Sequence, residues 1–109
     1  MNYKVKSIEV FERQAKRLVK KYASLKQELL TLIQELKEHP KQGTTIGKGC
    51  YKIRLAIASK GKGKSGGARV ITNFVIADHT VYLLAIYDKA ERENLTDKEL
   101  IELLKYIPQ

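Results

Sequence analysis

The sequence contains little of what builds disulfide frameworks or membrane spans. Its 109 residues include one cysteine and no tryptophan. The lone Cys50 has no partner for an internal disulfide, which agrees with a reducing cytoplasm. No apolar run approaches the ~20 residues that a membrane-spanning helix requires. Residues 1–4 also lack the apolar stretch of a signal peptide, so we expect a cytoplasmic chain without a membrane partner.

Residues that would hold a metal or a nucleotide are also missing from the expected positions. His39 and His79 lie far apart in the chain and far from the cysteine, so they make no zinc-ligand set. Gly63-Lys64-Ser65 has the ending of a P-loop, but Ala58 stands where the first glycine should be. A predicted strand follows this loop, whereas a P-loop leads into a helix. We therefore expect no metal and no cofactor.

Acidic side chains are absent from the middle third of the chain. Residues 39–77 carry eight lysines and arginines and no acid, whereas residues 78–109 carry four basic and seven acidic residues. The net charge of the whole chain is +9. A block of one sign attracts polyanions through counterion release and field focusing. The partner of this block could be nucleic acid, an acidic protein, or both in turn; the alternative is a solvated basic surface with no specific partner.

The first forty residues predict a strand followed by a helical hairpin. Residues 3–8 alternate in polarity as a strand does, and apolar residues recur at helical spacing over residues 11–22. Ser24 followed by Gln27 has the pattern of a capping box, which predicts the start of a second helix. That helix should end before Pro40, because the residue before a proline avoids helical geometry.

The rest of the chain predicts a connector, three strands and a last helix. Residues 41–49 read as the connector, and Thr96 with Glu99 forms a second capping box at the start of the helix. Alternating or β-branched apolar residues predict strands at 51–57, 69–76 and 81–87. The order β-α-α-β-β-β-α with short links favours a mainly antiparallel sheet, so we expect residues 1–109 to form one α+β domain. The helices should cover one face of this sheet and leave the other open.

A cluster of cations is predicted on the open face. Lys52 and Arg54 are two positions apart on one strand and therefore point the same way, and Arg69 begins the next strand. If these strands pair as a hairpin, the three side chains approach one patch, which Tyr87 and Lys89 border. Such a patch can bind phosphate and stabilise the charge that develops when a 2′-hydroxyl attacks its neighbouring phosphate. The alternative is that Tyr87 packs in the core and the cations are ordinary exposed strand residues.

Residues 60–67 contain four glycines and three lysines. Glycine permits positive φ and lets amides approach a ligand closely, so the loop could cradle phosphates. The alternative is a flexible hairpin tip with lysines that keep it soluble. Because chemistry needs fixed groups, we place the reaction on the flanking strands and interpret the loop as a mobile, cationic tether.

Two segments resemble the HigB-like branch of the RelE toxin superfamily. Residues 52–71 contain Lys-Ile-Arg and Gly-Gly-Ala-Arg, and residues 83–89 end in Tyr-Asp-Lys. The helical pattern over residues 11–36 also fits this family, so the resemblance spans most of the chain. It implies a RelE-like, microbial-ribonuclease-type fold and ribosome-dependent cleavage of messenger RNA in the A site. It also implies a cognate antitoxin protein as partner, besides the ribosome and the message.

The resemblance assigns expected roles to the clustered residues. Arg69 would stabilise the scissile phosphate, and Lys52 and Arg54 would position RNA or offset developing charge. Tyr87 or Lys89 would orient a group or transfer a proton. The expected contacts to RNA or the ribosome are Lys48, Lys60, Lys62 and Lys64.

Two other functions are compatible with the same pattern. ParE relatives share the fold and inhibit DNA gyrase, and a catalytically inactive toxin fold would act only as an RNA- or protein-binding module. The paired basic strands favour the ribonuclease, because gyrase inhibition does not need an RNA-cleaving cation cluster. The chain also departs from the family pattern, since Ala90 stands where many RelE toxins have an arginine.

Overall fold

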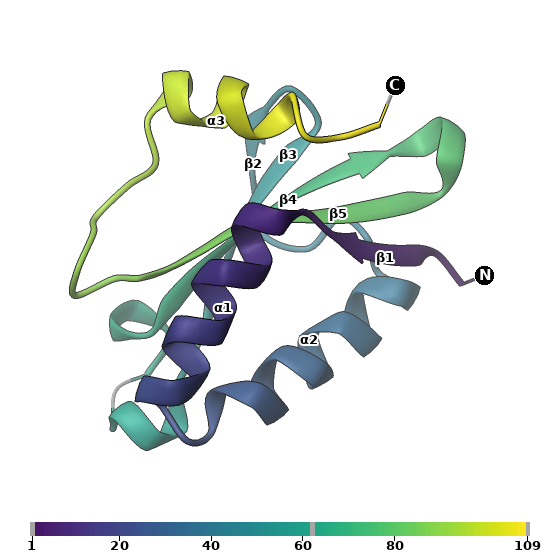
Figure 1. The fold of residues 1–109 in the computed structure, drawn as a ribbon. Helices are drawn as coiled ribbons and strands as arrows, with labels where there is room; N and C mark the ends of the chain where they lie inside the picture. The colour runs from purple at the N-terminus through teal and green to yellow at the C-terminus, as the bar shows by residue number, and fades with distance from the viewer. Residues whose placement is uncertain (1, 62, 109) are drawn as a thin grey trace.

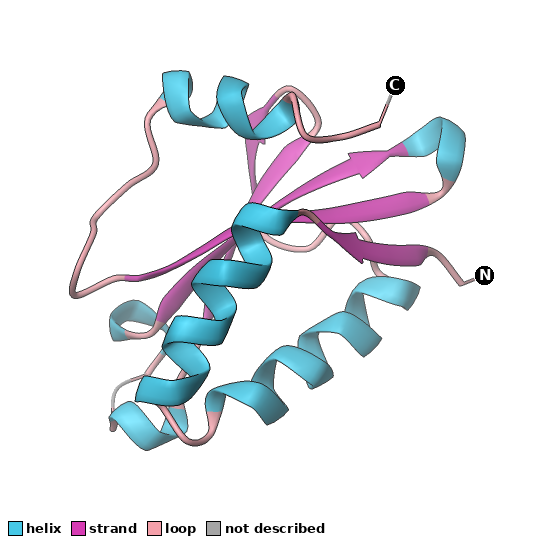
Figure 2. Cartoon of the chain, viewed as in Figure 1, coloured by secondary structure: helices cyan, strands magenta, loops and turns pink. Residues whose placement is uncertain are grey.

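The computed structural model describes residues 2–61 and 63–108, whose strands form one five-stranded sheet (Figures 1 and 2). The strand order across the sheet is β1-β5-β4-β3-β2. β1 pairs with β5 in parallel and all other neighbours are antiparallel. The strands are β1 (Lys4–Ser7), β2 (Thr44–Gly47), β3 (Cys50–Leu55), β4 (Ala68–Val75) and β5 (Thr80–Asp88). The predicted α+β class with a mainly antiparallel sheet is confirmed.

Helices lie on both faces of the sheet. α1 (Glu9–Lys21) and α2 (Leu25–Glu38) form the predicted hairpin on one face, whereas α3 (Asp97–Leu104) crosses the other (Figure 1). The expectation that all helices cover one face is therefore wrong. Every residue of β5 is buried, so this strand needs cover on both faces, and the buried Leu100 and Leu103 of α3 supply part of it.

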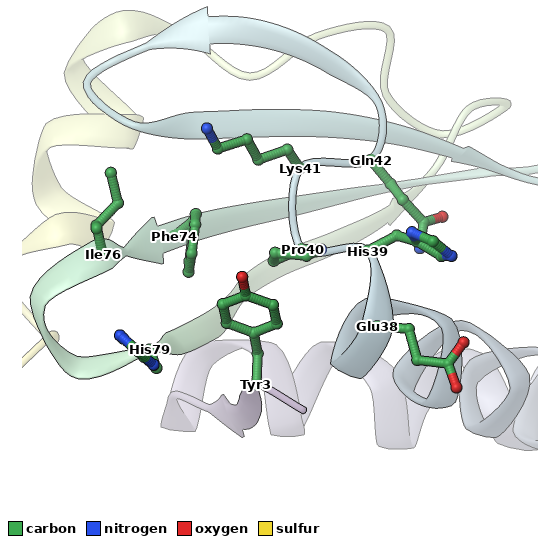
Figure 3. A pocket seen from close by; sticks show the side chains of 9 residues that line it. All are labelled: Tyr3, Glu38, His39, Pro40, Lys41, Gln42, Phe74, Ile76 and His79. Atoms are coloured by element: carbon green, nitrogen blue, oxygen red, sulfur yellow. The ribbon is translucent and has the colours of Figure 1, made fainter. Parts of the chain in front are cut away.

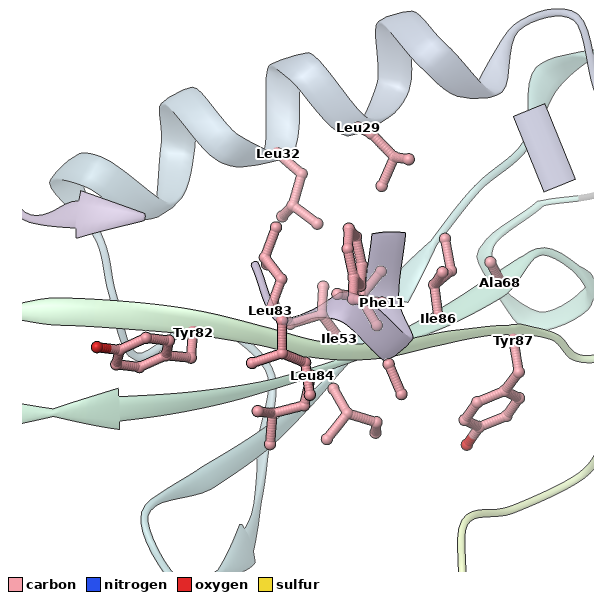
Figure 4. Close-up of a cluster of buried hydrophobic side chains, with 14 of the residues drawn as sticks. Phe11, Leu29, Leu32, Ile53, Ala68, Tyr82, Leu83, Leu84, Ile86 and Tyr87 are labelled. Carbon is pink, nitrogen blue, oxygen red and sulfur yellow. The ribbon is translucent and has the colours of Figure 1, made fainter. Parts of the chain in front are cut away.

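The main core lies between the helical hairpin and the sheet. Phe11, Leu29 and Leu32 reach from the helices toward Ile53 and Ile86 of the strands (Figure 4). The alternation of side chains along a strand sends every second residue to the opposite face. Residues of β3, β4 and β5 that do not face this core therefore point to the face that α3 covers.

A strand that the sequence did not indicate lies in the predicted connector. β2 pairs with β3 through a turn in which Gly47, Lys48 and Gly49 all have positive φ. Glycine adopts positive φ at no steric cost at Gly47 and Gly49, whereas Lys48 between them adopts it at some cost. The strand is only four residues long and half of it pairs with a register shift, so it leaves almost no periodic signal in the sequence.

The two predicted capping boxes have different outcomes. Thr96 and Glu99 form theirs, with reciprocal bonds at the start of α3. Ser24 makes no capping bond to α2. Its hydroxyl instead donates to Glu28 at 3.0 Å and lies 2.9 Å from the Ser59 hydroxyl. A tertiary contact has therefore replaced the local one at α2.

Candidate functional site

Three of the predicted site residues form a row across neighbouring strands. Arg54 of β3 lies opposite Arg69 of β4, and Arg69 lies opposite Tyr87 of β5. Residues in register share a face of the sheet, so these three side chains, here called the cationic row, lie on the α3 face. Lys52 occupies the same face two positions along β3. The register therefore places these residues on one face, as predicted, and their part in a reaction stays a prediction. Tyr87 also packs in the core, as the alternative held.

Arg69 is buried, with 4% of its surface exposed. Its Nη1 donates to the carbonyls of Lys64 at 2.8 Å and Ala68 at 3.1 Å, and its Nη2 donates to the Ser65 carbonyl at 3.1 Å. These bonds use three of the five guanidinium N–H groups. Among the described residues, the Nε–H and the second Nη2–H have no acceptor. Two N–H groups of the guanidinium are therefore unused within the described residues, and guanidinium N–H groups can bind phosphate oxygens.

Tyr87 lies beside Arg69 with its hydroxyl inside the protein. The residue is 6% exposed, and its hydroxyl has no hydrogen-bond partner among the described residues. Figure 4 shows the ring on the opposite side of the sheet from Phe11. Burial raises the pKa of the Tyr87 hydroxyl, although the nearby charges of Arg69 and Arg92 oppose that shift. Tyr87 is therefore a neutral hydrogen-bond donor at physiological pH.

Arg92 belongs to the site although the sequence did not point to it. Its guanidinium lies 5.8 Å from the centre of the Tyr87 ring, within cation–π range. Its Nε donates to the Asn94 carbonyl at 2.9 Å, and its Nη2 binds the Glu99 carboxylate. The backbone N–H of Thr96 and the Arg92 guanidinium lower the pKa of Glu99 to about 2. The charged Glu99 thus fixes Arg92 over the tyrosine.

The remaining candidate cations have weak or no bonds. Lys52 is half-buried and donates to the Asn94 side chain at 3.3 Å. Lys89 donates to the Glu93 carbonyl at 3.3 Å. Arg54 is exposed and forms no ion pair within the described residues. These side chains can exchange their present contacts for phosphate at little cost, because long polar contacts contribute little.

Lys60 has a different place from the one predicted. Its ammonium, 10% exposed, lies 2.5 Å from the Asp88 carboxylate and 2.8 Å from the Gly66 carbonyl. Asp88 is fully buried and also accepts from the Tyr22 hydroxyl and, at 2.9 Å, from the Ala90 N–H. Burial raises the pKa of Asp88, but these bonds outweigh it and hold the pKa at about 2. The expectation that Lys60 projects toward RNA is therefore corrected.

The glycine-rich loop is held at several points. It contains two 3-10 turns, η1 (Ala58–Lys60) and η2 (Lys64–Gly66). The Ala58 N–H donates to Glu28 at 2.8 Å and the Ser59 N–H donates to Ser24 at 2.9 Å, which binds η1 to the start of α2. The expectation of a mobile tether is wrong for these two turns, because each is bonded to the rest of the fold.

The other three loop and turn lysines have different positions. Lys62 lies outside the described residues. Lys64 is exposed and lines, with Lys52 and Arg54, a groove of about 900 Å³ between α2 and the edge of β3. Lys48 lies in the β2–β3 turn, six residues from Arg54 along an extended chain and thus roughly 20 Å away. The structure therefore brings Lys64 to the site and places Lys48 apart from it.

The two histidines line a separate pocket of about 530 Å³ (Figure 3). The Tyr3 ring meets Phe74 edge-on at 5.4 Å and lies 5.9 Å from the His79 ring. None of the predicted site residues lines this pocket.

Within the described ranges, no three His, Cys, Asp or Glu side chains are grouped to hold a metal ion. In the same ranges no helix has the length and apolar character of a membrane span.

Comparisons with known proteins agree with this fold. A family model described as the RelE toxin of the RelE/RelB toxin–antitoxin system matches residues 5–107. A double arginine-to-alanine mutant of the E. coli toxin RelE in the free state is 20% identical with a TM-score of 0.63, over 99% of this chain and 100% of that one. The isolated E. coli RelE toxin is 16% identical with a TM-score of 0.62, over 96% of this chain and 99% of that one. At these identities the structural matches show a common fold.

Proposed function

Because the chain belongs to the RelE family of toxin–antitoxin toxins, we propose that it stops translation by cutting messenger RNA in the ribosomal A site. The observation that carries this proposal is the register of β3, β4 and β5, which aligns Arg54, Arg69 and Tyr87 on one face. A row of this composition fits a phosphodiester that passes over the strands, because two guanidinium groups and a neutral phenol surround its oxygens.

The proposed reaction is an attack by the ribose 2′-oxygen on the adjacent phosphorus. The O2′–P bond forms and the P–O5′ bond breaks, so a 2′,3′-cyclic phosphate and a free 5′-hydroxyl result. The 2′-hydroxyl loses its proton to a water molecule, the 5′-oxygen gains one from the Lys89 ammonium, and Lys89 then takes a proton back from solvent. Negative charge grows on the non-bridging oxygens before the bond breaks, and fixed cations stabilise it.

Each residue of the site has a proposed part in this reaction. Arg69 donates its Nε–H and remaining Nη2–H to the non-bridging oxygens, and the loop carbonyls hold its guanidinium in place. Tyr87 donates a hydrogen bond toward the scissile group, which requires the side chains that bury its hydroxyl to move aside when RNA binds. Lys52 and Arg54 hold the flanking phosphates, and Lys89 supplies the proton to the leaving oxygen.

The proposed partner that neutralises the toxin is an antitoxin with an acidic segment. The eight cations of residues 39–77 have no acidic residue among them in the chain. An acidic segment that contacts Arg54 and Lys64, the exposed cations beside the cationic row, would cover the row and compete with RNA for it.

Induction of the chain in bacteria tests the activity. We expect growth arrest together with breaks inside translated messages, located by sequencing message ends. The matched variant is Arg54→Gln, because Arg54 is exposed and lacks an ion pair within the described residues, so this variant should fold as the parent does. It should cut fewer messages at an equal protein level.

Two outcomes would overturn the proposal. Arrest with intact messages and DNA-damage signalling would indicate a ParE-like attack on gyrase. Arrest that survives replacement of Arg54, Tyr87 and Lys52 together would indicate a binding module without catalysis.

A further inference from the structure

The outer face of α1 carries a cluster of cations that the proposed reaction does not use. A shallow depression of about 520 Å³ lies on this face, and basic side chains alone line it. All of them are exposed. We call this surface the α1 basic face; it consists of Arg13, Lys16, Arg17, Lys20 and Lys21.

Two members of the α1 basic face are already paired. Arg17 lies 2.7 Å and Lys21 3.2 Å from the Glu91 carboxylate. Among the described residues, Arg13, Lys16 and Lys20 have no carboxylate within ion-pair distance.

Helix geometry places the three unpaired cations on one stripe. They follow one another at spacings of three and four residues, which are neighbouring positions on a helix surface. Seven residues of helix advance by about 10 Å. The stripe therefore presents three positive charges in a line to solvent.

We propose that the α1 basic face is a second RNA-binding surface, which holds the phosphate backbone of a base-paired RNA. A specific protein partner usually buries an apolar anchor at the centre of its interface. No apolar side chain lines this depression. The exposed large apolar residues of the described chain lie elsewhere, on α2, in the β4–β5 turn, and in and after α3; they are Leu30, Ile76, Ile101 and Tyr106. Long, unpaired cationic side chains without apolar neighbours are suited to binding backbone phosphates, a mode of binding that does not depend on the base sequence of the RNA.

The α1 basic face and the cationic row are connected through one turn. Glu91, which binds Arg17 and Lys21, follows Tyr87 by four residues and stands between Lys89 and Arg92. Phe11 of α1 and Tyr87 of the cationic row lie on opposite sides of the sheet (Figure 4). RNA held on α1 would therefore flank the turn that carries two site cations, while the scissile strand occupies the other face. The choice of RNA as ligand rests on the proposed function, but this binding needs no cleavage.

The test is a salt titration of full-length protein with a 20-base-pair RNA duplex, followed by fluorescence anisotropy. The variant Arg13→Gln/Lys16→Gln/Lys20→Gln removes the three unpaired charges and keeps good helix formers. We expect duplex affinity to fall about tenfold or more at low salt. The slope of log K against log salt should become shallower by about two to three, because each phosphate contact contributes roughly 0.9.

The control variant is Lys4→Gln/Lys26→Gln/Lys98→Gln, which removes the same charge from scattered exposed positions. Its affinity should stay within about threefold of the parent. Equal losses in both variants would overturn the proposal, because net charge alone would then explain binding. Parent-like duplex binding by the α1 variant, with loss of antitoxin capture, would also overturn it and identify a protein-binding face. Absence of message breaks after induction of the parent would instead count against the proposed function and leave this result standing.

Discussion

The ammonium of Lys60 lies 2.5 Å from the buried carboxylate of Asp88 and joins the glycine-rich loop to the end of β5. The same ammonium donates to the Gly66 carbonyl. The neighbouring carbonyls of Lys64 and Ser65 accept from the Arg69 guanidinium. The ion pair therefore fixes the loop that holds the central arginine of the site.

Replacing Lys60 should weaken the whole fold. In Lys60→Met the Asp88 carboxylate stays buried without its main cation, which typically costs about 3–5 kcal/mol of unfolding free energy. Urea unfolding followed by circular dichroism measures this loss. The matched control is Lys64→Met in the same loop, whose side chain is exposed, and its stability should change by less than ~0.5 kcal/mol. Equal effects in the two variants would contradict a structural ion pair.

Stability should fall in acid because of Asp88. Its pKa is about 2 in the folded chain and 3.8 ordinarily, so the folded state favours the charged carboxylate. This contribution, ~2 kcal/mol, is complete above the ordinary pKa and disappears as the pH falls from about 4 through about 2. Urea midpoints measured from pH 6 to pH 2.5 should show the decline. The Asp88→Asn variant should be less stable at pH 6 and decline less; a parallel decline would remove Asp88 as its cause.

Two glycines of the loop should differ in their tolerance of alanine. A Cβ at Gly67 would collide with the Leu55 carbonyl, whereas a Cβ at Gly63 would meet nothing within 4 Å. Gly67→Ala should therefore lose about 2 kcal/mol or more, since the backbone must shift to relieve the collision. Gly63→Ala should be neutral or slightly stabilising, because Gly63 has negative φ. Thermal melts of both variants check this, and an unaffected Gly67→Ala would show that β3 and the loop are not in close contact.

Tyr87→Phe should separate catalysis from stability. The hydroxyl is buried without a partner among the described residues, so its removal should leave stability unchanged or raise it by up to ~1 kcal/mol. Message cleavage should fall about tenfold or more if the hydroxyl donates to the substrate. Because burial raises the Tyr87 pKa, cleavage should show no ionisation of this group between pH 7 and pH 9. Full activity in a stable Tyr87→Phe protein would assign the ring to packing alone.

Arg69→Lys should test the geometry of the guanidinium. Lysine keeps the positive charge but lacks the planar fork that faces two phosphate oxygens. Cleavage should fall about a hundredfold, whereas Arg54→Lys at the exposed end of the row should lose less than about fivefold. Cleavage of a defined message by purified ribosomes with each variant measures the difference. Similar losses at the two positions would show that charge alone matters.

The helical hairpin, four of the strands and the convergence of Lys52, Arg54, Arg69 and Tyr87 could be predicted from the sequence. These features follow from short-range periodicity, which fixes which residues of an element share a face. The antiparallel pairing of β3 and β4 agrees with the expected hairpin, although the connection between them, residues 56–67, contains two 3-10 turns.

The sequence by itself thus determined the helices, four of the five strands and the membership of the cationic row, whereas the tertiary structure added β2 and decided how the row is supported. Lys60 turned inward because a carboxylate 28 residues later is buried beside it. Arg92 came over Tyr87 because Glu99, on the first turn of α3, holds its guanidinium. α3 packs on the second face of the sheet, where it helps to bury the side chains of β5 that point away from the helical hairpin. These contacts depend on the burial of groups that are distant in sequence. Local sequence patterns therefore cannot predict them.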